Sequence, residues 1–122
     1  MDLNELREFC LAKRGTTEEF PFDKDTLVFK VMGKMYALLP LERWERGEPS
    51  INLKCDPDYA LELRASYPGI TGGYHMSKTH WNTLNLENGD IPVSMVYKLV
   101  DHSYEMVVKG MPARLRKELE KL

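Results

Sequence analysis

Apolar residues recur with a helical period at both ends of the chain. The N-terminal stripe predicts a helix that Asp2 caps and Gly15 ends. Its members are Leu3, Leu6, Phe9 and Cys10. A longer stripe over residues 92–109 predicts a central core helix that is poorly capped at Pro92, and Leu115, Leu119 and Leu122 predict a last short helix.

Between these ends the hydrophobic period changes to two, which is typical of half-buried strands. Residues 27–32 alternate, Gly33-Lys34 follows, and residues 35–39 alternate again. A glycine in the first central position favours a two-residue type II′ turn, so we expect a β-hairpin here. We expect residues 16–25 to form irregular structure or an edge strand, because Pro21 cannot lie in a central strand.

The second half of the chain offers two further strands and one helix. Residues 41–49 form a charged connection, and Ile51, Leu53 and Cys55 then lie on one face of a third strand, opposite Asn52 and Lys54. Asp56-Pro57 predicts a helix start, with Asp at the cap and Pro at the first position. Residues 81–87 alternate as a fourth strand, and Asn88-Gly89 turns the chain.

These elements predict one α+β domain over residues 1–122, in which helices pack on a mainly antiparallel sheet. No segment approaches the roughly 20 apolar residues of a membrane span, and the acidic start lacks the pattern of a secretory signal. We therefore expect a cytoplasmic protein. Cys10 and Cys55 are expected to be buried, reduced thiols, because two cysteines make no disulfide framework.

The net charge is −2, which argues against nonspecific coating of nucleic acid. The charges are nevertheless segregated. Residues 26–41 and 63–86 hold four of the 17 Lys and Arg residues and none of the 19 Asp and Glu residues. If these two acid-poor windows meet in space, the molecule has one positively biased face.

No catalytic or phosphate-loop signature is present in the sequence. His75 and His80 have a spacing that suits neither a helix face nor a hairpin pair, so we expect no metal and no cofactor. A nucleophilic pair of Cys55 with either histidine would need a proximity and a lowered thiol pKa that the sequence does not provide. A structural hydrogen bond or a surface position explains His102.

The densest group of chemically capable side chains lies in residues 74–82. Tyr74 and Trp81 offer flat faces for stacking, and Lys78, the two histidines and Asn82 add hydrogen-bond donors. Lysines on the predicted hairpin could contact phosphates. The alternative is structural: an indole at the start of a strand is usually part of the core, and single lysines usually face solvent.

Several short segments of the sequence resemble the MmcQ/YjbR family, and together the resemblance covers essentially the whole chain. The segments that carry the resemblance are Glu19-Phe20-Pro21-Phe22, Val28-Phe29-Lys30-Val31, Gly33-Lys34-Met35, Asn52-Leu53-Lys54-Cys55-Asp56-Pro57, Gly73-Tyr74-His75-Met76, His80-Trp81-Asn82-Thr83 and Asp101-His102-Ser103-Tyr104. Two positions depart from the family pattern: Gly72 stands where the family often has Pro, and Val93 replaces the usual acidic cap.

The resemblance implies an α+β, secretion-chaperone-like fold and a DNA-binding protein with a double-wing motif, and it implies no reaction. In this interpretation lysines contact phosphate while the 74–82 segment shapes or stacks on bases. The candidate residues are Lys30, Lys34, Lys54, Tyr74, His75, Lys78, His80, Trp81 and Asn82. The alternative is a domain that binds a small anionic or aromatic ligand, or a chaperone-like adaptor, using the same groove. The oligomeric state stays open.

Overall fold

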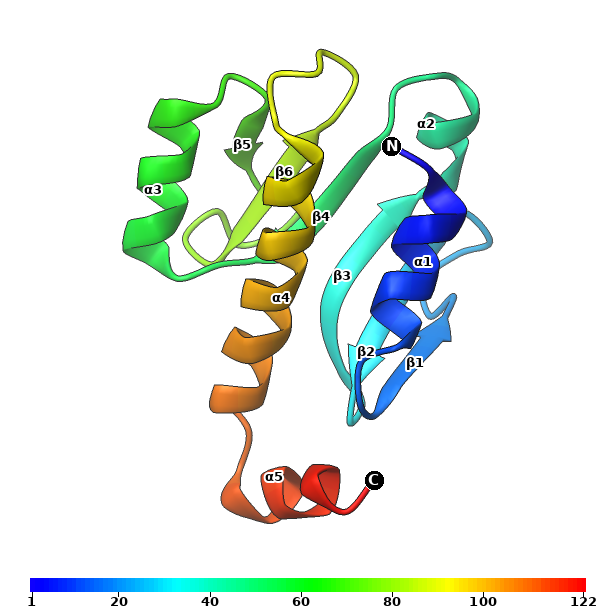
Figure 1. Cartoon of the computed structure of the whole chain (residues 1–122), viewed down its shortest axis with the longest axis vertical. Helices are drawn as coiled ribbons and strands as arrows, with labels where there is room; N and C mark the ends of the chain where they lie inside the picture. The colour runs from blue at the N-terminus through cyan, green and yellow to red at the C-terminus, as the bar shows by residue number, and fades with distance from the viewer.

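A computed structural model describes residues 1–122 as five helices around one six-stranded sheet (Figure 1). The strands are β1 (Thr16–Glu19), β2 (Thr26–Val31), β3 (Lys34–Pro40), β4 (Ser50–Lys54), β5 (Ile70–Gly72) and β6 (Trp81–Asn85). The helices are α1 (Leu3–Leu11), α2 (Leu41–Glu45), α3 (Pro57–Ser66), α4 (Val93–Lys109) and α5 (Ala113–Glu120). All neighbouring strands pair antiparallel, in the order β1-β2-β3-β4-β6-β5, which confirms the expected α+β class.

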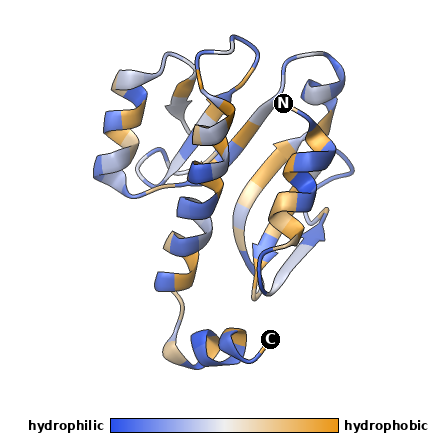
Figure 2. Ribbon diagram, viewed as in Figure 1, coloured by the Kyte–Doolittle hydropathy of each residue, from blue (hydrophilic) through white to orange (hydrophobic).

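Helices α1 and α4 cover one face of the sheet, and the core lies beneath them (Figure 1). This core contains 22 buried residues, among them Leu6 of α1, Phe29 of β2, Ile51 of β4 and Val100 of α4. Figure 2 shows hydrophobic segments along β2 and β3 as well as within α1 and α4. The opposite face of the sheet is the open face, and no helix packs on the middle of it.

The helix starts follow the capping residues. The Asp2 carboxylate accepts a hydrogen bond from the backbone N–H of Asn4 at 2.8 Å, and Asp56 accepts from that of Tyr59 at 3.1 Å. Pro92 provides no side-chain cap for α4, as expected. Burial of its apolar stripe therefore stabilises α4. No helix combines the length and apolar character that a membrane span requires.

The hairpin between β2 and β3 has a different turn from the one predicted. Val31 pairs with Lys34, so the two central residues are Met32 and Gly33, not Gly33 and Lys34. Both have positive φ angles, 50° for Met32 and 80° for Gly33, which is the pattern of a type I′ turn. The type II′ prediction was wrong because it placed the glycine one position too early in the turn.

Two short elements were missed in the sequence. The charged connection after Pro40 contains α2, and β5 adds a three-residue edge strand beside β6. Both are too short for a hydrophobic period to show. The segment before Pro21 forms β1, an edge strand, which agrees with the expectation for that proline.

The sheet is weakly joined at its centre. Strands β3 and β4 share only two register pairs, Ala37 with Leu53 and Leu38 with Asn52. Ser103 of α4 bridges them, because its hydroxyl accepts a hydrogen bond from the backbone N–H of Lys54 and donates one to the carbonyl of Tyr36. The two halves of the sheet diverge from this point.

Candidate ligand-binding groove on the open sheet face

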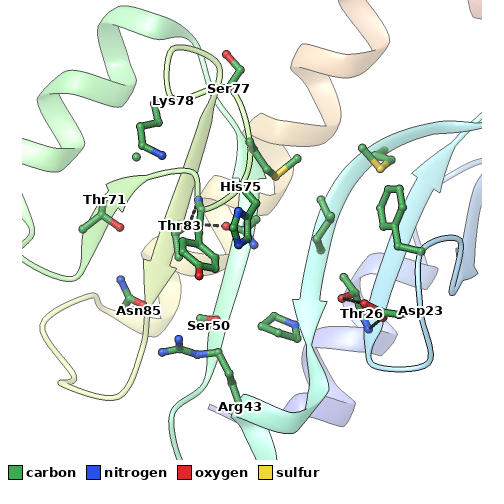
Figure 3. A pocket seen from close by; sticks show the side chains of 18 residues that line it. Asp23, Thr26, Arg43, Ser50, Thr71, His75, Ser77, Lys78, Thr83 and Asn85 are labelled. Carbon is green, nitrogen blue, oxygen red and sulfur yellow. Dashed lines mark hydrogen bonds between the residues drawn. The ribbon is translucent and has the colours of Figure 1, made fainter.

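A groove of about 900 Å³ crosses the open face of the sheet between its two halves (Figure 3). We call it the open-face groove, and 18 residues line it. One wall comes from β2, β3 and the loop before β2, and the other from β5, β6 and the loop between them. Apart from the loop before β2, these walls come from the two acid-poor windows, so the windows do meet in space.

The floor of the open-face groove is built from uncharged polar side chains. Ser50 and Asn52 of β4 pair in register with Asn85 and Thr83 of β6, and Thr71 of β5 pairs with Thr83. Residues two apart in a strand point to the same face, so the apolar neighbours of these residues fill the core instead. The register therefore sets two rows of hydroxyl and amide groups across three strands.

The loop of residues 73–80 holds two aromatic rings over the groove. The rings of Tyr74 and His75 lie 4.0 Å apart, centroid to centroid, with an angle of 50° between their planes. The backbone N–H of Tyr74 donates to Thr83 Oγ1 at 3.1 Å, and Thr83 in turn donates to Asn52 Oδ1. His75 has a φ of 58°, an uncommon backbone conformation for a residue other than glycine. Such local strain is often found in ligand-binding loops.

Charged groups at the groove are mostly basic. Arg43 of α2 lines it beside Ser50, and Lys78 lines it at the far end of the loop (Figure 3). The Lys78 ammonium donates to the carbonyl oxygen of Gly73 at 3.2 Å. The one lining carboxylate, Asp23, accepts hydrogen bonds from the backbone N–H groups of Thr26 and Asp25, which lowers its pKa. Asp23 thus has a structural role in the turn before β2.

Phe22 completes the groove on the wall opposite the aromatic loop. Its side chain is 64% exposed although it is large and apolar. Tyr74 is 69% exposed on the other wall. Two exposed aromatic side chains on facing walls offer contact area to a flat ligand at little conformational cost.

A second, smaller concavity lies where β3 and β4 diverge toward the end of α4. This lysine–indole cleft has a volume of about 380 Å³ and brings together Lys34, Lys54 and Trp81 against Met111. Neither lysine forms an ion pair, and the indole is half-buried. The cleft and the open-face groove share Met35 in their linings.

The residues expected to form one site are therefore divided. Tyr74, His75 and Lys78 line the open-face groove, whereas Lys34, Lys54 and Trp81 line the cleft. Lys30 lines neither, and its ammonium pairs with the Glu19 carboxylate at 3.3 Å. The exposed His80 ring lines neither concavity.

Asn82 is the clearest correction to the expected set of ligand-binding residues. It is 1% exposed, and its Oδ1 accepts a hydrogen bond from Arg64 Nε at 2.8 Å. The Arg64 guanidinium also donates to the backbone carbonyls of Lys78 and Trp81. Asn82 therefore helps to hold the end of the 73–80 loop through Arg64. Because its side chain is buried, it cannot contact a base. The strand alternation that turns Thr83 toward the groove turns Asn82 inward.

The groups considered for catalysis are not joined through their side chains. The backbone N–H of Cys55 donates to the carbonyl oxygen of His80 at 2.8 Å, but no hydrogen bond links the Cys55 thiol to an imidazole. Burial raises the pKa of Cys55 to about 11 and that of Cys10 to about 12, so both thiols stay protonated at neutral pH. His102 Nε2 accepts a hydrogen bond from the backbone N–H of Asp56 at 3.1 Å, a structural role. No three His, Cys, Asp or Glu side chains gather as a metal site would require.

Several groove residues were not among the sequence candidates. Those with polar or aromatic side chains include Phe22, Arg43, Ser50, Asn52, Thr71, Thr83 and Asn85. A signal existed for part of this set: Ser50 and Asn52 alternate with the apolar Ile51 and Leu53 in β4, and Thr83 and Asn85 flank Leu84 in β6. Arg43 had no such signal, because the helix that presents it was read as a connection.

Comparison with known proteins places the chain in context. Residues 11–106 match the family model described as YjbR. The Escherichia coli K12 protein YjbR is 32% identical over 122 residues, all of both chains. The YbdF protein of Escherichia coli O157:H7 is 36% identical over 100 residues, which are 82% of this chain and 79% of that one.

Solved structures agree with this likeness. The crystal structure of the Deinococcus radiodurans protein DR2400, a DUF419 domain, superposes with a TM-score of 0.86 and 38% identity, covering 97% of this chain and 87% of the other. A Pseudomonas syringae protein superposes with a TM-score of 0.71 and 29% identity, covering 87% of this chain and 98% of the other. From the model match and the full-length relatives, the chain belongs to the YjbR family.

Proposed function

We propose that this protein is a non-catalytic binding domain that takes a small ligand in the open-face groove. The observation that carries the proposal is the composition of the groove: a polar, uncharged floor between walls that bear exposed aromatic rings. Small-molecule sites are concave, with apolar walls and a few placed polar groups. A volume of about 900 Å³ is within the range of such sites.

The groups around the groove support binding rather than chemistry. Neither the His75 nor the His80 imidazole forms a hydrogen bond with a hydroxyl, thiol or carboxylate that it could activate. The two thiols are buried away from the groove. A domain that holds a ligand without transforming it needs shape, hydrogen bonds and charge, and the open-face groove has all three.

A screen of a chemically mixed small-molecule library by thermal shift tests the proposal. We expect compounds that raise the melting temperature of the wild-type protein, because ligands that bind only the folded state stabilise it. Phe22→Ala should abolish the shift, since Phe22 lines the groove. Phe20→Ala is the matched control, because Phe20 is 49% exposed on the same loop but does not line the groove.

Two results would contradict the proposal. One is a library in which no compound stabilises the wild-type protein. The other is a set of stabilising compounds that respond equally to Phe22→Ala and Phe20→Ala, because such compounds bind elsewhere.

A second candidate function, DNA binding, is favoured by the lysine–indole cleft. Lys34 and Lys54 are free of ion pairs and flank a half-buried indole on which a base could stack. The two lysines could contact only a few phosphates, so binding should be weak and should fall steeply between about 50 and 200 mM salt. The open-face groove would then be an extension of the nucleic-acid path, since both concavities share Met35.

Fluorescence anisotropy with single- and double-stranded DNA separates the two functions. DNA binding predicts an affinity at about 50 mM salt that the double variant Lys34→Gln, Lys54→Gln removes. Lys98→Gln, an exposed lysine on α4 outside the cleft, should leave it unchanged. No binding at low salt would exclude this candidate.

A further inference from the structure

The fixed hydrogen-bonding groups of the groove floor indicate which ligand class it takes. We infer that the open-face groove binds a flat heterocycle that carries an anionic group, a phosphate or a carboxylate. The inference rests on the proposed binding function and names its ligand. Three parts of the groove support it: the two asparagines of the floor, Arg43 at one end, and the aromatic walls.

The orientation of the Asn52 amide is set by a chain of hydrogen bonds. The backbone N–H of Tyr74 can only donate, so Thr83 Oγ1 accepts from it and gives its own proton to Asn52 Oδ1. The Asn52 amide nitrogen is then left without a partner in the protein. At this point the floor presents a hydrogen-bond donor.

The Asn85 amide is oriented the opposite way. Its nitrogen donates to the carbonyl oxygen of Gly69 at 3.0 Å, and a carbonyl can only accept. Asn85 Oδ1 accepts no hydrogen bond in the protein, and the neighbouring Ser50 hydroxyl makes none either. The floor therefore presents an acceptor at Asn85 that lies two register pairs along β4 and β6 from the donor at Asn52. A flat heterocycle that carries both a ring carbonyl and a ring N–H, such as a pyrimidine base, offers the complementary acceptor and donor.

Arg43 supplies the charge at the end of the floor that holds Ser50 and Asn85 (Figure 3). Its Nε donates to the carbonyl oxygen of Glu48 at 3.3 Å, and one terminal nitrogen lies 3.8 Å from the Glu48 carboxylate. The other terminal nitrogen has no partner in the protein. A guanidinium fixed along one edge and free along the other can pair with a phosphate or a carboxylate. Lys78 at the far end is held by Gly73, so Arg43 is the better anion anchor.

The aromatic walls explain the preference for a flat ligand. The Tyr74–His75 ring pair on one wall and Phe22 on the other leave ring faces and edges exposed above the polar floor. A planar ring can lie against these walls while its edge reaches Asn52 and Asn85. An aliphatic chain would leave the floor groups unsatisfied, which costs affinity.

The test uses four probes: uridine monophosphate, orotate, uridine and inorganic phosphate. Uridine monophosphate and orotate join a uracil ring to a phosphate or a carboxylate, whereas uridine and inorganic phosphate each have only one of the two parts. We expect at least one combined probe to bind, by calorimetry, at least about tenfold more tightly than uridine and than inorganic phosphate. Which combined probe binds identifies the anionic group.

Substitutions place the two parts of the ligand in the groove. Arg43→Gln should weaken the binding of the combined probe at least about tenfold and leave the binding of uridine unchanged. Arg43→Lys keeps the charge but loses the paired N–H donors of the guanidinium, so it should weaken the binding of the combined probe less. Arg46→Gln is the matched control, because Arg46 is next to the same helix but does not line the groove. Asn52→Leu should weaken the binding of uridine and the binding of the combined probe to the same extent.

The inference is overturned if uridine, or inorganic phosphate, binds as tightly as both combined probes. It is also overturned if Arg43→Gln and Arg46→Gln weaken the binding of the combined probe equally. It is also overturned if no probe binds. In that case the library screen with Phe22→Ala and Phe20→Ala still decides whether the groove binds small molecules of another class. The ligand class and the binding function can therefore fail separately.

Discussion

Ser103 of α4 donates a hydrogen bond of 2.6 Å to the carbonyl oxygen of Tyr36 in β3. The same hydroxyl accepts the backbone N–H of Lys54 in β4 at 2.9 Å. A single buried side chain thus replaces the ladder bonds that β3 and β4 lack beyond their two register pairs. Because the strands separate here, the sheet has two halves, and the open-face groove and the lysine–indole cleft both lie along their junction.

Removing the Ser103 hydroxyl should therefore destabilise the whole protein. Ser103→Ala leaves a buried N–H and a buried carbonyl without a partner, and we expect the free energy of unfolding to fall by about 1–3 kcal/mol. Urea denaturation followed by circular dichroism measures this change. Ser94→Ala on the same helix is the control, since Ser94 is exposed. Equal midpoints for the two variants would show that Ser103 does not hold the strands.

The type I′ turn makes a prediction about Gly33. A Cβ atom at this position would meet nothing within 4 Å, so Gly33→Ala tests backbone conformation without steric overlap. Because φ is 80° at Gly33, we expect Gly33→Ala to lower the free energy of unfolding by about 1–2 kcal/mol. Gly33→Asn should cost less, because asparagine tolerates positive φ. If Ala and Asn are tolerated equally, the turn is not of this type.

The adjacent glycines before the aromatic loop should respond differently to alanine. A Cβ at Gly73 would lie 2.8 Å from the Cβ of Trp81, inside the paired strands, whereas a Cβ at Gly72 would lie 3.0 Å from Cγ of the flexible Lys78 side chain. We expect Gly73→Ala to reduce the free energy of unfolding by about 1–3 kcal/mol. Gly72→Ala should be nearly neutral, because Lys78 can move. Thermal or urea unfolding of both variants measures this, and the reverse order would contradict the close packing of Gly73 on Trp81.

The imidazole of His102 should make stability depend on pH. Burial lowers the pKa of His102 below its ordinary value of 6.5, and the neutral ring accepts the N–H of Asp56. The unfolded chain therefore binds a proton more readily than the folded one. This contribution to stability is complete above about pH 6.5 and is lost as the pH falls through the lower pKa of the folded state.

Urea unfolding at several pH values between about 5 and 7.5 tests this expectation. The wild-type protein should lose stability toward the acid end, and His102→Gln should show a smaller loss over the same range. Identical pH dependences for wild type and His102→Gln would contradict the proposed role of His102.

The sequence predicted helices and helix starts correctly where a single periodic or local interaction determines them. The period of apolar residues placed α1 and α4, and the pairs Asp2–Leu3 and Asp56–Pro57 marked helix starts because capping is a local interaction. The turn at Met32 was missed because a positive φ at methionine is costly alone and is accepted only within the paired hairpin.

The candidate site was only partly visible in the sequence. Tyr74, His75 and Lys78 are neighbours in the loop, so proximity along the chain served as a guide. The same guide failed for Trp81 and Asn82, because the strand alternation and the divergence of β3 from β4 decide where they point. The partners that complete the groove, Arg43 and Phe22, come from segments that only tertiary structure brings near.

The two tryptophans allow one measurement of the central claim, that the open-face groove is the binding site. Trp44 Nε1 donates to the carbonyl oxygen of Ser50 at 2.9 Å, beside Arg43 at the end of the groove, whereas Trp81 lines the lysine–indole cleft. In a 15N-resolved NMR spectrum the two indole N–H signals therefore report on the two concavities. On titration with whichever of uridine monophosphate and orotate binds more tightly, we expect the Trp44 signal to shift together with the side-chain amides of Asn52 and Asn85, while the Trp81 signal stays. A shift of the Trp81 signal alone, or of neither, would contradict it.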